Sequence, residues 1–197
     1  MKTEPPSSNR PLVIINGIST PRFVASAFGL LFRLRGFRVF TADQTFLNYG
    51  DIRTAARLVD EKVKEALAET RADKVDLIGM SLGGLIGLYY VKCGGGARYV
   101  DRFISLGGPL KGSPLAYLSL IPPFEWMTSL GQTRPESDII RELREAKAPE
   151  GVRIYSVGTS GDWITPRSVW DAEGAIPVET SGPEGYPIRG QIGNPWR

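Results

Sequence analysis

The feature that most constrains the fold is a passage from strand to helix between Val75 and Leu85. The segment reads VDLIGMSLGGL, an apolar run followed by a turn with Gly79 and Gly83 on its two sides. Val75 to Ile78 is typical of a short buried strand, and Leu82 to Cys93 continues as an apolar helix. Glycine on both sides of the turn lets the strand and the helix approach closely. Strands that pass directly into helices build parallel sheets, because parallel neighbours need a crossover connection.

The rest of the chain repeats this alternation of strands and helices. Further strands are expected at residues 12–15, 37–41, 100–106, 152–157 and 175–178. The last of these contains Pro177, which cannot donate to a ladder, so it is expected at an edge of the sheet. The predicted fold class is α/β, a mostly parallel sheet with helices on both faces.

Two helices precede the glycine turn. In the first, Thr20 is the expected N-cap and Pro21 the first helical position, and Gly36 ends the helix. In the second, from Asp51 to Thr70, the apolar residues form one face. The residues that keep helical spacing are Phe23, Val24, Ala27, Leu31 and Leu34 in the first helix and Ile52, Ala56, Val59, Val63 and Leu67 in the second. Cys93, at the end of the third helix, is expected to be inert core.

The region between residues 112 and 150 interrupts the alternation. Ile121 to Met127 is apolar and rich in turn residues, and it is followed by a helix that Ser137 caps and that carries Ile139, Ile140 and Leu143. An excursion of this kind between two strands predicts a small cap or lid. Residues 1–10 are expected to be a flexible lead-in, and residues 11–197 a single domain that includes this cap.

Composition and charge exclude several classes of function. The formal net charge is only +3 over 197 residues and the basic residues are scattered, so a nucleic-acid partner is not expected. One cysteine and no histidine exclude a zinc site of the usual type. No apolar stretch is long enough to span a bilayer. The start of the chain does not resemble a signal peptide, so a cytoplasmic setting is expected.

The turn from Gly79 to Gly83 fits the pattern G-x-S-x-G. A serine hydroxyl becomes a useful nucleophile when its geometry is fixed and a base takes its proton. In a strand–turn–helix setting Ser81 would project its hydroxyl at the carboxyl end of the sheet, with the Leu82 amide as an oxyanion donor. The alternative is that the glycines serve packing or phosphate binding alone.

Several segments together resemble the α/β-hydrolase superfamily, and within it the bacterial triacylglycerol lipases and esterases. They are LVIINGIST, VDLIGMSLGGLIGLYY, VDRFISLGGPLKGSPLA, RPESDIIRELRE and YSVGTSGDWITP. They occur in the family's order and extend from about Leu12 to Pro166. The resemblance implies the α/β-hydrolase fold, with a small cap insertion.

The resemblance also implies a role for each matching residue. Ser81 is the nucleophile, the backbone amides of Ile18 and Leu82 form the oxyanion hole, and Asp162 is the acid of the triad. Asp43 is an alternative acid, although a loop cap is its more ordinary role. The cap residues that line an acyl-binding groove, or else form the underside of the cap, are Phe124, Trp126 and Met127. The substrate would be a small-molecule or lipid ester, with no cofactor.

The chain departs from the family where histidine is common. Asn16 and Met80 replace two of these histidines, and neither loss removes a backbone donor. The third is the catalytic base, whose place falls loosely on Tyr186. A phenol, with a pKa of about 10, is almost wholly protonated at neutral pH and replaces imidazole poorly. Lys111 is the alternative base.

Two functions therefore follow from the sequence. One is a lipase- or esterase-like serine hydrolase that cleaves carboxylic esters with an apolar acyl group, impaired because the base is absent. The other is a catalytically inactive relative that binds a lipid-like ligand or a protein partner. Truncation, divergence and engineered removal of histidine would each explain the missing base, and the sequence does not predict the oligomeric state.

Overall fold

In the residues that the structure describes, a parallel sheet of six strands forms the centre of the fold. The computed structural model describes residues 10–18, 20–42, 49–159 and 166–180. The strands are β1 (Leu12–Ile15), β2 (Val39–Ala42), β3 (Val75–Met80), β4 (Val100–Leu106), β5 (Arg153–Thr159) and β6 (Ile176–Thr180). Their order across the sheet is β2-β1-β3-β4-β5-β6, and every neighbouring pair is parallel. The α/β prediction is confirmed, and β6 with Pro177 lies at the edge as expected.

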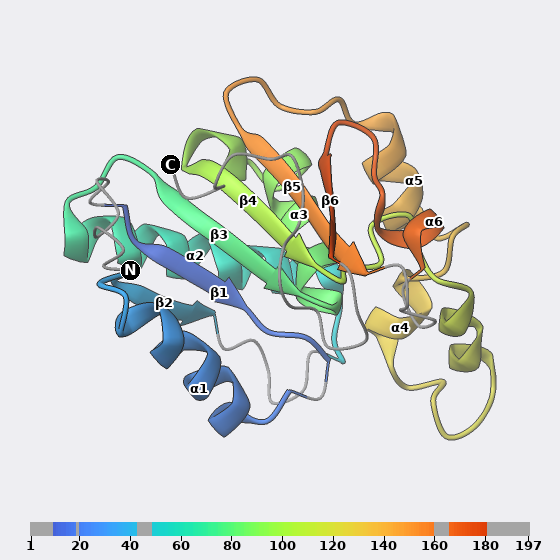
Figure 1. Ribbon diagram of the computed structural model, residues 1–197. Helices are drawn as coiled ribbons and strands as arrows, with labels where there is room; N and C mark the ends of the chain where they lie inside the picture. The colour runs from blue at the N-terminus through green and yellow to red at the C-terminus, as the bar shows by residue number, and fades with distance from the viewer. Residues whose placement is uncertain (1–9, 19, 43–48, 160–165, 181–197) are drawn as a thin grey trace.

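Helices cover both faces of this sheet (Figure 1). Helix α1 (Arg22–Arg33) lies on one face, while α2 (Ile52–Thr70) and α3 (Leu82–Lys92) lie on the other. Alternate residues of the strands divide between two buried clusters. Ile15 and Phe103 join the cluster of α2 and α3, whereas Ile14 and Ile104 join the cluster that includes Phe28 and Phe32 of α1.

The helix before β2 differs from the sequence prediction in two ways. Pro21 is its N-cap, without a side-chain cap hydrogen bond, so the assignment of Thr20 as the cap was wrong. The residues with the predicted spacing also do not all face the sheet, because Phe23 and Leu34 are exposed. Phe28 and Phe32 pack on the strands instead, since the helix covers only the edge formed by β1 and β2.

Cys93 was also misplaced by the sequence prediction. The residue is exposed, not core. Helix α3 is buried from Leu82 to Val91 and ends at Lys92, so the chain emerges at the surface one residue before Gly94. The short 3-10 turn η1 (Gly96–Arg98) then leads into β4.

The insertion between β4 and β5 lies beyond the carboxyl ends of the strands (Figure 1). It consists of η2 (Pro114–Leu120), α4 (Thr128–Gln132) and α5 (Asp138–Glu145). Ser137 caps α5 by accepting a hydrogen bond from the Ile140 amide, as the sequence predicts. The short helix α6 (Arg167–Trp170) precedes β6. In the described ranges, no helix is long and apolar enough to cross a membrane.

Candidate active site

Ser81 occupies the sharp turn between β3 and α3 with a strained backbone. Its φ of 50° and ψ of −124° are unusual for a residue with a side chain. Two hydrogen bonds hold this conformation. The Ser81 amide donates to the Leu106 carbonyl (2.9 Å), and the Gly84 amide donates to the Ser81 carbonyl (2.8 Å). Strain of this type costs about 1–3 kcal/mol and persists only where the surroundings impose it.

The two glycines beside the turn are required by close backbone contacts. A Cβ at Gly79 would lie 2.3 Å from the Gly83 carbonyl oxygen. A Cβ at Gly83 would lie 2.4 Å from the Ile15 carbonyl oxygen. Both distances are far inside van der Waals contact with atoms that cannot rotate away, so any side chain here would push α3 off the sheet. The close approach inferred from the motif is therefore present.

The Ser81 side chain does not serve as an ordinary helix cap. At the start of α2, Asp51 accepts from the Thr54 amide, and at the start of α5, Ser137 accepts from the Ile140 amide. Ser81 stands at the equivalent place in α3 but makes no side-chain cap hydrogen bond. Because the residue is also exposed, its hydroxyl is accessible from solvent at the carboxyl end of β3.

The loop after β1 lies directly beside this serine. A Cβ at Gly17 would lie 3.0 Å from the Ser81 Cβ and 3.1 Å from the Met80 carbonyl oxygen. Ile18, which follows, is half-buried and packs on the cluster of α2 and α3. Leu82 is buried at the first position of α3. The fold thus brings the Gly17–Ile18 loop and the start of α3 together around Ser81, from segments more than sixty residues apart in the sequence.

Three of the predicted site residues lie outside the described residues. They are Asp43, Asp162 and Tyr186. Their roles as acid and as the replacement for the base therefore remain predictions. Lys111, the alternative base, is exposed, and its amide donates to the Val169 carbonyl (2.9 Å). With Lys92 and Leu143, Lys111 lines a hollow of about 410 Å³ beside α5.

The three residues of the insertion predicted to contact an acyl chain lie on or near its surface. Phe124 and Trp126 are exposed, and the Trp126 ring packs edge-on against Tyr49 with their centroids 4.7 Å apart. Met127 lines a second hollow, of about 510 Å³, in the insertion. The described contacts of these side chains are with the insertion and with the segment before α2.

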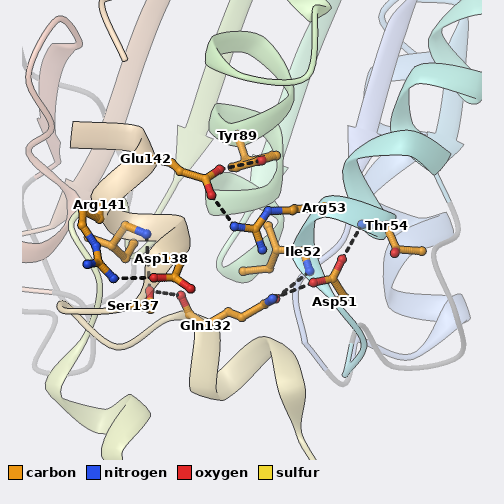
Figure 2. A network of polar contacts seen from close by, with 11 residues as sticks. Asp51, Ile52, Arg53, Thr54, Tyr89, Gln132, Ser137, Asp138, Arg141 and Glu142 are labelled. Carbon is orange, nitrogen blue, oxygen red and sulfur yellow. Dashed lines mark hydrogen bonds and ion pairs between the residues drawn. The ribbon is translucent and has the colours of Figure 1, made fainter. Parts of the chain in front are cut away.

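A polar network joins α4 of the insertion to the start of α2 (Figure 2). Gln132 accepts a hydrogen bond from the Ile52 amide (2.7 Å) and donates to the Asp51 carboxylate (2.6 Å). Burial alone would raise the pKa of Asp51, but hydrogen bonds from Gln132 and Thr54 outweigh it, and the pKa lies below its usual value. The sequence identified Asp51 only as the start of a helix, because its partner Gln132 lies 81 residues away.

A second part of the network joins α5 to α2 and α3 (Figure 2). Glu142 pairs with Arg53 and accepts a hydrogen bond from the Tyr89 hydroxyl (2.8 Å). The hydrogen bonds from Arg53 and then Tyr89 hold the pKa of Glu142 below its usual value. Burial, followed by the bond to Glu142, raises the pKa of Tyr89. No local pattern predicts this contact, since its members come from three separate helices.

The described part of the chain shows no cluster of metal ligands. No group of three or more histidine, cysteine, aspartate or glutamate side chains comes together there in a way that would hold a metal ion. The site described by the structure is an exposed serine at a strained turn, with the Gly17–Ile18 loop beside it.

Comparison with known proteins finds one family-model match and similar solved structures. Residues 57–122, which include the turn at Ser81, match the model of the lecithin:cholesterol acyltransferase family. The mature form of the Bacillus licheniformis lipase BlEst2 is 14% identical with a TM-score of 0.70, covering 90% of this chain and 85% of that chain. Aspergillus fumigatus lipase B is 20% identical with a TM-score of 0.66, covering 88% of this chain and 42% of that chain. Paleococcus ferrophilus monoacylglycerol lipase is 15% identical with a TM-score of 0.58, covering 88% of this chain and 86% of that chain.

The fold is that of the α/β-hydrolases. These similar structures are of lipases, and at 14–20% identity the likeness shows a shared fold. The family model covers the segment that contains β3, the serine turn, α3 and β4.

Proposed function

We propose that the protein is a serine ester hydrolase of low turnover, acting on carboxylic esters with an apolar acyl group. The observation that carries the proposal is Ser81 at the turn between β3 and α3. Its backbone is strained, the residue is exposed, and its side chain does not cap α3. The protein holds this residue in an unfavourable backbone conformation, which is common at functional sites. The similarity to lipases supports the choice of an ester as substrate.

In the proposed reaction the Ser81 hydroxyl oxygen attacks the ester carbonyl carbon. The carbonyl oxygen becomes an oxyanion that accepts hydrogen bonds from the Ile18 and Leu82 amides, and the hydroxyl proton passes to hydroxide or water as the new C–O bond forms. Collapse expels the alcohol, which takes up a proton, and leaves an acyl-serine. Water then attacks this ester and releases the carboxylic acid, which restores the Ser81 hydroxyl.

The absence of histidine determines which steps are slow. No imidazole exists anywhere in the 197 residues to take the serine proton or to activate water. Losing one triad member leaves a residual acceleration of about 10³–10⁴-fold over water, from the oxyanion hole and binding. Asp162, Tyr186 and Lys111 are the groups we propose to test as orienting acid and substitute base. Phe124, Trp126 and Met127 are the proposed contacts for the acyl chain, with the insertion as a cap.

The test is Ser81-dependent chemistry in the full chain. Hydrolysis of p-nitrophenyl butyrate and labelling by a fluorophosphonate are measured for the wild type and for Ser81→Ala. We expect slow turnover that rises with pH as hydroxide replaces the base, and both signals vanish in Ser81→Ala. Ser168→Ala, a change at an exposed serine in α6, is the control and keeps both signals. Turnover and labelling that do not depend on Ser81 would show that the proposal is wrong.

The second candidate function is a non-catalytic binder of a lipid-like ligand, and the missing histidine is the observation that favours it. Tyr186→His separates the two readings further. If Tyr186 occupies the place of the base, this change raises hydrolysis strongly, and Asp162→Asn then lowers it again. If the protein is instead a non-catalytic binder, Tyr186→His does not raise the rate of hydrolysis.

A further inference from the structure

Helix α1 carries large apolar side chains on the side that faces away from the sheet. Phe23, Leu30 and Leu34 are 75%, 50% and 76% exposed. Their spacing of seven and four residues places them on one face of the helix. Phe28 and Phe32 lie on the opposite face and pack against the sheet. The helix is therefore apolar on both sides, whereas a surface helix of a soluble protein is usually polar on its outer side.

Arginines flank this outer face, and the stretch of sequence that contains α1 carries no acid. From Pro5 to Ala42 the chain has five arginines and neither aspartate nor glutamate. Arg33 is the last residue of α1, and Arg35 and Arg38 follow it before β2; all three are exposed. The Arg33 guanidinium donates to the Val39 carbonyl (3.1 Å) and that of Arg35 to the Leu31 carbonyl (3.0 Å). Both side chains keep further N–H donors that these two bonds do not use.

We infer that α1 docks the protein on an anionic lipid surface, with Phe23, Leu30 and Leu34 entering the interface and Arg33, Arg35 and Arg38 contacting the headgroups. A helix with an apolar face beside cationic side chains lies in the plane of a membrane interface and favours anionic lipids. A second copy of this chain fits the face poorly, because two arginine-flanked surfaces would meet without an acid to neutralise them.

This surface is separate from the serine site. Ser81 stands at the carboxyl end of β3, whereas α1 covers the edge of the sheet formed by β1 and β2 (Figure 1). Exposed apolar residues of η2 in the insertion, such as Leu118 and Leu120, form a different region of the surface. The inference does not require hydrolysis, so binding and turnover succeed or fail independently.

Vesicle flotation of the full chain tests the inference. The vesicles are pure phosphatidylcholine, or equal parts phosphatidylcholine and phosphatidylglycerol, at low and at high salt. We expect the wild type to float with the anionic vesicles at low salt. Leu30→Gln with Leu34→Gln weakens this partitioning at least about tenfold, because two leucines no longer enter the interface. Arg33→Gln with Arg35→Gln also weakens it about tenfold or more, and reduces its dependence on salt.

Matched variants keep the result interpretable. Glutamine is a good helix former and the changed positions are exposed, so circular dichroism and the melting temperature should stay at wild-type values. Leu30→Met with Leu34→Met keeps an apolar face and should keep binding. Leu118→Gln with Leu120→Gln should also leave binding unchanged.

Three results would overturn the inference. The first is equal binding to neutral and anionic vesicles, or no binding to either. The second is loss of binding in the Leu118 and Leu120 variant but not in the Leu30 and Leu34 variant. The third is a dimer in sedimentation that the Leu30 and Leu34 variant dissociates, without any effect on vesicle binding, since α1 would then be a self-association surface.

Discussion

The strained backbone of Ser81 predicts different stabilities for two small substitutions. Ser81→Ala removes the hydroxyl but keeps a Cβ at a φ of 50°. Ser81→Gly removes both the hydroxyl and the Cβ, and glycine adopts positive φ without steric cost. We therefore expect the glycine variant to be the more stable of the two, although both lose the proposed nucleophile.

The size of the difference follows from two opposing effects. Relief of backbone strain contributes about 1–3 kcal/mol. The greater freedom of glycine in the unfolded chain opposes it by about 0.4–1 kcal/mol. The net advantage of glycine over alanine at position 81 is thus about 0–2.6 kcal/mol. For a protein of this size each 1 kcal/mol shifts the melting temperature by about 2–4 °C.

Calorimetry and urea unfolding of the two variants measure this difference, and fluorophosphonate labelling checks that both have lost the reactive serine. The control pair is Ser168→Gly and Ser168→Ala in α6, where the backbone is helical and alanine should be the more stable. If Ser81→Gly is less stable than Ser81→Ala, the turn is not strained. In that case the backbone of Ser81 carries no conformational cost that a catalytic role would explain.

The remaining predictions concern packing and charge. Gly29→Ala in α1 should stabilise the protein by about 1 kcal/mol, because the new Cβ would meet Val39 at an ordinary 3.5 Å and alanine is the better helix former. Glu142→Gln should lower the melting temperature at neutral pH, and its difference from the wild type should shrink as pH falls below 4.5. The pKa of Glu142 is depressed in the folded state, so its contribution is present above the unfolded pKa and is lost on acidification. Arg102→Met should destabilise by about 3–5 kcal/mol, because it leaves the buried Asp76 carboxylate without its bidentate partner, and adding Asp76→Leu should restore most of the loss.

Each of these predictions has a matched control. Gly87→Ala in α3 should destabilise the protein, because its Cβ would lie 2.5 Å from the Phe103 ring. The same substitution at Gly29 and at Gly87 should therefore change the stability in opposite directions. Glu145→Gln, on the exposed side of α5, should leave the acid dependence unchanged. Arg153→Met, which removes an exposed partner of Asp101, should cost less than 1 kcal/mol. Melting curves across pH measure all three.

Local patterns predicted the strands and the serine turn because both depend on neighbouring residues. The bounds of β1 and β4 agree with those read from the apolar runs, and Gly79 and Gly83 marked the turn. The same kind of pattern misplaced the inner face of α1 and the burial of Cys93. Periodicity identifies a helix with an apolar stripe, but it does not say which element the stripe meets or whether anything covers it.

The sequence by itself determined the class of fold and the position of the candidate nucleophile, Ser81. Both depend on local features of the chain, namely the glycines around Ser81 and the alternation of strands and helices. Only the tertiary structure decided what surrounds that serine and how the insertion is held. The contact of Gly17 with Ser81 and the network of Arg53, Tyr89 and Glu142 join segments that are far apart in sequence. Such contacts are set by how the helices pack on the sheet, and no local pattern records them.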